Sequence, residues 1–251
     1  WMILANFTMK KNYKTTIAIG IALAVIANGV FSDSAFAVIR PNFCANLSRS
    51  ISTLDQRVIV RENILKTRQT EKLANLKNNR NLRDIKLKEL KQNVSTNLSA
   101  TYSKMETLAK TDQQKTAVNN FKIAMENAVN TRTTSIDAAA SAYRQEIDRI
   151  IASRNSAIDA AVQNFKNSYR GAVQNAKTNC TAGVKPLVAR ITFVEKVGAA
   201  KSNLISAKQK IVNPAPLIKS ASTVYKNAVA EANQNFKTAA EKARADLKAS
   251  F

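Results

Sequence analysis

Apolar residues recur every three or four positions along most of this chain, a spacing that predicts amphipathic helices rather than strands. The first such stretch lies between Cys44 and Lys110, and leucine is its commonest apolar residue. The stripe turns polar at Asn78-Asn79-Arg80-Asn81, which leaves open a break or a kink there. The pattern therefore predicts a first helix over about 44–110.

A second helix is expected directly after the first. Thr111-Asp112-Gln113-Gln114 has the T-x-x-Q spacing of a capping box, with an acid in the first turn. We expect Thr111 and Gln114 to cap the helix, because each side chain can bond the backbone amide of the other residue. No proline interrupts the chain from there to Lys177, so this helix is predicted over about 112–178.

The second helix contains an internal repeat. Phe121, Tyr143 and Phe165 are spaced by 22 residues, and each is followed by Lys or Arg. A period of 11 residues is close to three full helical turns, so these positions share one face. One interpretation is a row of stacking aromatics and cations for single-stranded nucleic acid or glycans. We favour the other, in which the aromatics pack in a core and the cations lie at its edge.

Two more helices are predicted after Gly183, over about 186–211 and 217–249, separated by Asn213-Pro214-Ala215-Pro216. Their apolar faces need a partner. We expect them to pack on the end of the hairpin that carries the cysteines, making a four-helix region with a projecting two-helix arm. Self-association and weak binding to anionic lipid are the alternatives.

The two cysteines, Cys44 and Cys180, lie equally far in sequence from Asp112. Folding the two helices back on Thr111 brings the cysteines together, so we predict a structural disulfide, with an intermolecular bridge as the alternative. Each arm of about 67 residues would be roughly 100 Å long. The predicted fold is all-α: a long antiparallel two-helix coiled-coil hairpin (38–182) with a C-terminal helical pair (183–251) and no β-sheet.

Residues 1–37 have the layout of a secretory leader. Lys10, Lys11 and Lys14 precede an apolar run, and Ala35-Phe36-Ala37 closes it as an A-x-A site. We expect cleavage after Ala37, a start of translation at Met9, and residues 1–8 to be an artefact. An uncleaved membrane anchor is the alternative, although the apolar run is short for a spanning helix. The expected location is outside the cytoplasm: periplasm, cell surface or extracellular.

The chain is strongly basic, with 39 Lys and Arg against 17 Asp and Glu and a net charge of +22. The excess lies mostly in 38–111 and 181–251, which makes these segments the candidates for contact with an anionic partner. The competing interpretation is that the lysines only solvate helix faces. Candidate contact residues are Arg80, Arg83, Lys86, Lys208, Lys210, Lys237 and Lys242.

No catalytic pattern accompanies this charge. Histidine is absent, which removes the commonest general base and the commonest metal ligand. Glu146 and Asp148 are two apart on a helix and point in different directions. The sequence therefore predicts a protein that is not an enzyme and has no cofactor or metal.

Three functions remain. We favour a structural or interaction protein of the cell envelope, whose partner is an anionic envelope polymer or another envelope protein. The alternatives are a periplasmic holdase chaperone with helical arms and an extracellular protein that binds DNA without reading its sequence. A homo-oligomer is a further possibility, which the holdase in particular would require, and membrane contact is expected only through an uncleaved leader.

Overall fold

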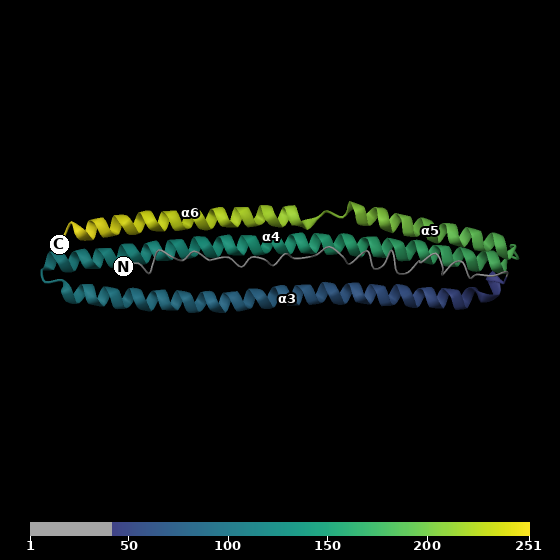
Figure 1. Cartoon of the computed structure of the whole chain (residues 1–251), viewed down its shortest axis with the longest axis horizontal. Coiled ribbons are helices and arrows are strands. Elements are labelled where there is room, and N and C mark those ends of the chain that lie inside the picture. The colour runs from purple at the N-terminus through teal and green to yellow at the C-terminus, as the bar shows by residue number, and fades with distance from the viewer. Residues whose placement is uncertain (1–41) are drawn as a thin grey trace. The chain divides into compact units, whose positions relative to one another are not determined.

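The computed structural model describes residues 42–251, which form four helices (Figure 1). These are α3 (Phe43–Leu108), α4 (Asp112–Thr181), α5 (Pro186–Lys210) and α6 (Pro214–Lys248). No strand occurs within this range, so the predicted all-α hairpin with two further helices is confirmed there. The expected leader and its cleavage site lie outside the described residues.

The chain divides into two compact units. Among the described residues, the first contains 42–66 together with Val162–Lys208, and the second contains Thr67–Ala161 together with Gln209–Phe251. Each unit thus takes a segment of α3, a segment of α4 and one of the two C-terminal helices. The sequence analysis divides the chain differently, into a hairpin over 38–182 and a C-terminal helical pair over 183–251. Each compact unit instead combines part of the hairpin with one helix of that pair.

The turn between α3 and α4 is held by the predicted capping box. The Gln114 backbone amide donates to Thr111 Oγ1 at 3.2 Å, and the Thr111 amide donates to Gln114 Oε1 at 3.3 Å. The Lys110 amide donates to the same Oε1 at 2.9 Å. These bonds satisfy amides that a helix start would otherwise leave without partners. The polar run at 78–81 does not interrupt α3, which is one helix from Phe43 to Leu108.

The end of α4 follows from a single glycine. Gly183 has φ of 74°, a conformation that costs a side-chain-bearing residue more than glycine. The Val184 amide donates to Asn179 O and the Gly183 amide donates to Cys180 O, which together form a Schellman motif. Pro186 then begins α5. The helix therefore ends one residue after the cysteine.

Asn213 sets the start of α6. Its side-chain oxygen accepts from the Ala215 amide at 3.1 Å, with Pro214 at the first helical position. The helix consequently begins at Pro214, earlier than the sequence pattern indicates at Leu217. Proline is tolerated here because a first-turn amide has no intrahelical partner to lose.

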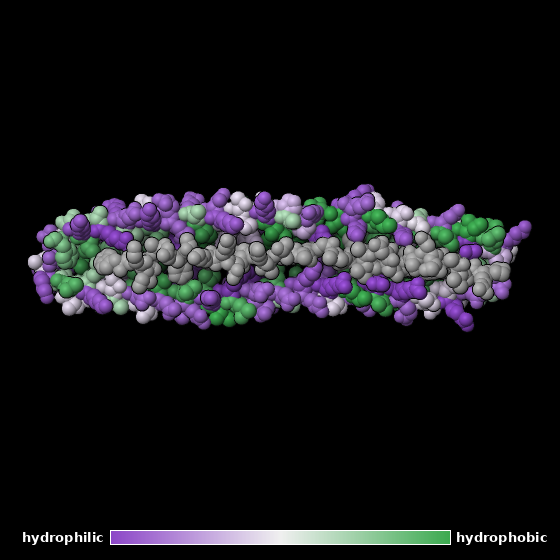
Figure 2. Space-filling model, in the orientation of Figure 1, coloured by the Kyte–Doolittle hydropathy of each residue, from purple (hydrophilic) through white to green (hydrophobic). Residues whose placement is uncertain are grey.

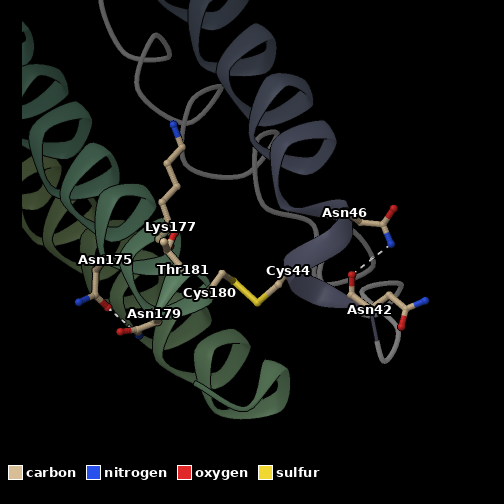
Figure 3. Close-up of a disulfide and its surroundings, with 8 residues drawn as sticks. All are labelled: Asn42, Cys44, Asn46, Asn175, Lys177, Asn179, Cys180 and Thr181. Atoms are coloured by element: carbon tan, nitrogen blue, oxygen red, sulfur yellow. Dashed lines mark hydrogen bonds between the residues drawn. A yellow bond between two sulfur atoms is a disulfide. The ribbon is translucent and has the colours of Figure 1, made fainter. Parts of the chain in front are cut away.

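The core of the first unit lies around the disulfide. Cys44 at the start of α3 is bonded to Cys180 near the end of α4, with the two Cα atoms 5.5 Å apart (Figure 3). Next to the bridge, the fully buried ring of Phe43 lies 5.9 Å from that of Phe193 on α5. The α3 side of this core continues with Leu47, Ile51, Leu54, Val58 and Leu65, all buried.

The core of the second unit includes α6. Tyr102 of α3, Met125 of α4, and Ala240 and Ala243 of α6 form one buried cluster. Leu98, Phe121, Ala124 and Phe236 pack against it. The expectation of a four-helix region at the cysteine end is therefore wrong, because α6 packs on the segment of α4 that follows the turn.

The α3 segment between Leu65 and Tyr102 contains no fully buried residue. Its leucines at 76, 87, 90 and 98 are only half-buried. Apolar burial is consequently thinner here than at either end of α3, and polar contacts contribute more to the packing of α3 on α4.

Candidate polyanion-binding surface

Many of the charges are already engaged in contacts between α3 and α4. In the second unit, Arg80 pairs with Asp148 at 2.9 Å and Lys91 pairs with Asp137 at 2.6 Å. Gln69 Nε2 also donates to Asp159 Oδ1 at 3.4 Å. Successive contacts are 11 residues apart on both helices, so they recur after about three turns on the same face.

A second set of pairs has the opposite polarity, with the acid on α3 and the base on α4. In the second unit Arg144 pairs with Asp84, and Lys122 with Glu106 at 3.8 Å. In the first unit Lys166 pairs with Glu62 at 2.8 Å. These three bases are the residues that follow the repeat aromatics at 121, 143 and 165. Their charges therefore meet acids of this chain.

The Asp84–Arg144 contact changes the acidity of both groups. Hydrogen bonding by the Arg144 guanidinium holds the pKa of Asp84 below its ordinary value. The same bond raises the pKa of Arg144. Both shifts favour the charged forms, as expected when opposite charges share a hydrogen bond.

The repeat aromatics of the second unit contact neighbouring helices. The Tyr143 ring lies 5.4 Å from that of Tyr225 on α6, and Phe121 meets Tyr102 edge-on at 6.3 Å. Arg132 lies between Phe121 and Tyr143 in the sequence of α4. Its guanidinium carbon is 5.3 Å from the ring centre of Phe236 on α6, and its Nε donates to Asn233 Oδ1 at 2.7 Å. In the first unit Phe165 is buried and stacks on Tyr169. The packing interpretation of the repeat thus agrees with these contacts.

Arg80 is also removed from the candidate contact surface. Its side chain is only 16% exposed, and besides Asp148 it donates to the Arg144 backbone oxygen at 3.4 Å. The polar run at 78–81, where the sequence suggested a break in the helix, therefore contains a residue, Arg80, that links α3 to α4. Sequence alone could not separate Arg80 from Arg83, since both lie in the same cationic segment.

A set of exposed residues on α3 forms the strongest candidate site. These residues follow one another at spacings of three or four, which places them on one helix face. All six are exposed, four are cations and two are amides. We call this set the basic stripe: Arg68, Lys72, Asn75, Asn79, Arg83 and Lys86.

The basic stripe belongs wholly to the second unit and spans about 27 Å of helix at 1.5 Å per residue. No acid occupies any of its six positions. Within residues 42–251, Arg68 and Lys86 form no ion pair, and the Arg83 guanidinium bonds the Asn79 backbone oxygen at 3.3 Å. Hydrophilic residues likewise cover much of the visible helix surface in Figure 2.

The sequence-predicted contacts therefore divide into groups. Arg83 and Lys86 belong to the basic stripe, whereas Lys208 is half-buried and Lys210 is exposed at the end of α5. On α6, Lys237 pairs with Glu241 and Lys242 pairs with Asp246, each one turn away. Sequence reasoning missed Arg68, Lys72 and the two amides. Their spacing along one face was the available signal.

Metal sites and membrane-spanning helices are both absent from the described range, residues 42–251. It contains no group of three or more acidic or cysteine side chains placed to hold a metal ion. None of the helices from α3 to α6 has the length and apolarity needed to cross a membrane.

No protein-family model, curated protein or solved structure matches this chain.

Proposed function

We propose that this protein is an exported, non-enzymatic helical protein of the cell envelope that binds an anionic polymer through the basic stripe. The observation that carries the proposal is the separation of charges on α3. Arg80, Asp84 and Lys91 face acids and bases of α4, while the four cations of the basic stripe lie together on an exposed face.

Electrostatics supports a polymer as the partner. Four cations along one face attract a chain with repeated negative charges more strongly than a single small anion, because several contacts form together. Binding of this kind releases counterions and weakens steeply with salt. Residues 1–37 hold Lys10, Lys11, Lys14 and Asp33 and so account for +2 of the net charge of +22. The remaining +20 on residues 38–251 adds long-range attraction for an anionic polymer.

The test compares two variants that each lose four positive charges. The stripe variant carries R68Q, K72Q, R83Q and K86Q. The control carries K104Q, K110Q, K226Q and K248Q, which alter exposed lysines off the stripe. Fluorescence anisotropy with labelled long-chain polyphosphate measures affinity from 50 to about 200 mM salt, the range over which counterion release is pronounced.

We expect the stripe variant to lose at least tenfold in affinity, with a slope of log affinity against log salt reduced by about 3, at roughly 0.7 per lost contact. The control should lose much less. Equal losses in both variants would overturn the basic stripe as the site, and absence of binding by the unaltered protein would overturn the proposed function.

Export is supported by the basic, apolar and A-x-A pattern of residues 1–37. Mass spectrometry of the protein released by cells tests it. The expected mature chain begins at Val38, and a chain that retains the apolar run would contradict cleavage.

One observation favours the holdase as a second candidate. On the first turns of α5, Leu187, Val188 and Ile191 are all exposed large apolar side chains. Such side chains are the kind that contact unfolded chains. A holdase should suppress aggregation of an unfolded client protein, and replacement of Leu187 and Ile191 by Ser should reduce that suppression. No suppression by the unaltered protein would exclude this candidate.

A further inference from the structure

We infer that the polymer bound by the basic stripe carries hydroxyl groups between its negative charges and lies lengthwise along α3. This inference rests on the proposed function and concerns the same surface. Its basis is the order of residues on the stripe, where Asn75 and Asn79 stand between Lys72 and Arg83. Cations therefore flank a pair of amides on one exposed face.

The two amides are available for hydrogen bonds. In the part of the chain that the structure describes, neither the Asn75 nor the Asn79 side chain bonds another protein group. Arg83 engages only the backbone oxygen of Asn79, so the side-chain amide is not involved. An amide offers two donors and an acceptor, which match a hydroxyl group that both donates and accepts. A bare phosphate oxygen uses only the donors.

The same segment disfavours recognition of nucleic-acid bases. Residues 67–98 contain no Phe, Tyr or Trp, so this part of α3 has no aromatic platform on which bases stack. The repeat aromatics Phe121 and Tyr143, which would have offered one, contact other helices of the second unit. Charge and hydroxyl bonding are thus the chemistry that the stripe presents.

A lengthwise arrangement follows from the shape of the stripe. Its six residues form a narrow line of about 27 Å parallel to the helix axis. A polymer crossing the helix would meet only one or two cations, whereas one aligned with the axis meets all four. Glycerol phosphate alone should therefore compete poorly with its polymer.

The test uses two polymers and two variants. Poly(glycerol phosphate) carries hydroxyl groups between phosphates, and long-chain polyphosphate has none along its chain. The test variant is N75A with N79A, and the matched control is N81A with Q92A, two exposed amides that are eleven residues apart on another face of the same helix. Alanine is a better helix former than asparagine or glutamine, so folding is preserved in both, and circular dichroism checks this.

We expect N75A with N79A to weaken binding of poly(glycerol phosphate) about tenfold and to leave polyphosphate binding unchanged, since hydrogen bonds to hydroxyls are lost and charge is not. The control should change neither affinity. Equal effects of the test variant on the two polymers, or no effect on either, would overturn the hydroxyl inference while polyphosphate binding still supports the proposed function. Failure of the unaltered protein to bind polyphosphate would instead reject the proposed function itself.

Discussion

Arg144 of α4 and Asp84 of α3 form a bidentate ion pair, in which both terminal guanidinium nitrogens donate to the two carboxylate oxygens. The Nη1 to Oδ2 distance is 2.9 Å. The pair belongs to the α3 segment that lacks fully buried side chains. It thereby supplies geometric specificity where apolar packing is thinnest, since a bidentate contact is satisfied in only one register of the two helices.

A double-mutant cycle with D84N and R144Q measures this coupling. We expect about 0.5–1 kcal/mol, at the upper end for surface pairs, because the geometry is bidentate but both side chains are partly exposed. Urea unfolding supplies the free energies. The Lys242–Asp246 pair within α6 serves as a control and should give about 0.3–0.5 kcal/mol. A coupling near zero for Asp84 and Arg144 would contradict a role in specifying register.

The stability of the second unit should fall in acid. Asp84 has a pKa below its ordinary value of 3.8, because Arg144 bonds the charged carboxylate. A carboxyl with a lowered folded-state pKa contributes stability above 3.8, and this contribution is lost as the pH falls through the folded pKa. The measurement is the urea midpoint between pH 6 and about 2.5. The urea midpoint of D84N should fall less over this pH range than that of the unaltered protein. Identical dependence of the midpoint on pH in the two proteins would contradict a contribution from Asp84.

Reduction of the disulfide should destabilise the first unit. Cys44 and Cys180 are 136 residues apart, and closing so long a loop stabilises by about 5 kcal/mol in the chain-entropy model. Urea unfolding of the oxidised protein and of a C44A, C180A variant measures the loss. Helix content without denaturant should remain similar, since the helices make their own backbone bonds. Equal midpoints would show that the bridge contributes little.

Buried positions of α3 in the first unit should be more sensitive to truncation than exposed positions of α3 in the second unit. Leu65 is 2% exposed, and L65A should cost about 2–5 kcal/mol through lost burial and a cavity. Leu82 on the same helix is 58% exposed, and L82A should change stability by no more than about 0.5 kcal/mol. A similar cost at both positions would mean that Leu82 is covered in solution.

The capping box offers a test at the turn. Removal of the Thr111 hydroxyl in T111A should cost about 1 kcal/mol, because the Gln114 amide loses its acceptor. T107A is the matched control. The Thr107 hydroxyl donates only to the Ser103 oxygen of its own helix, so its loss should be neutral or slightly stabilising. Thermal unfolding compares the two, and equal shifts would discount the cap.

Local signals in the sequence located most element boundaries. The T-x-x-Q spacing identified the Thr111 cap, and Gly183 with Pro186 marked the end of α4 and the start of α5. Such signals work because a cap or a positive φ depends on residues only a few positions apart. The start of α6 was placed later than Pro214, since the second proline at 216 obscured the Asn213 cap.

Long-range placement was harder to predict. The repeat of aromatics and cations indicated a shared face, but it did not tell which helix each face meets. The structure shows that Tyr143 contacts α6, whereas its neighbour Arg144 contacts α3. For the same reason the pairing of Arg80 with Asp148 was missed, and Arg80 was grouped with exposed cations that lie on other faces of α3.

By itself, the sequence determined the all-α class and the hairpin turn at Thr111, and it favoured the pairing of Cys44 with Cys180 over an intermolecular bridge. Helical period, capping chemistry and equal arm lengths are properties of the chain alone. Only the tertiary structure decided which charges meet each other between α3 and α4, where α6 packs, and which cations remain together on an exposed face. The physical reason is that contacts between distant residues depend on how each helix is rotated about its axis and on the register between helices. Interactions between residues close in sequence do not specify that rotation or register.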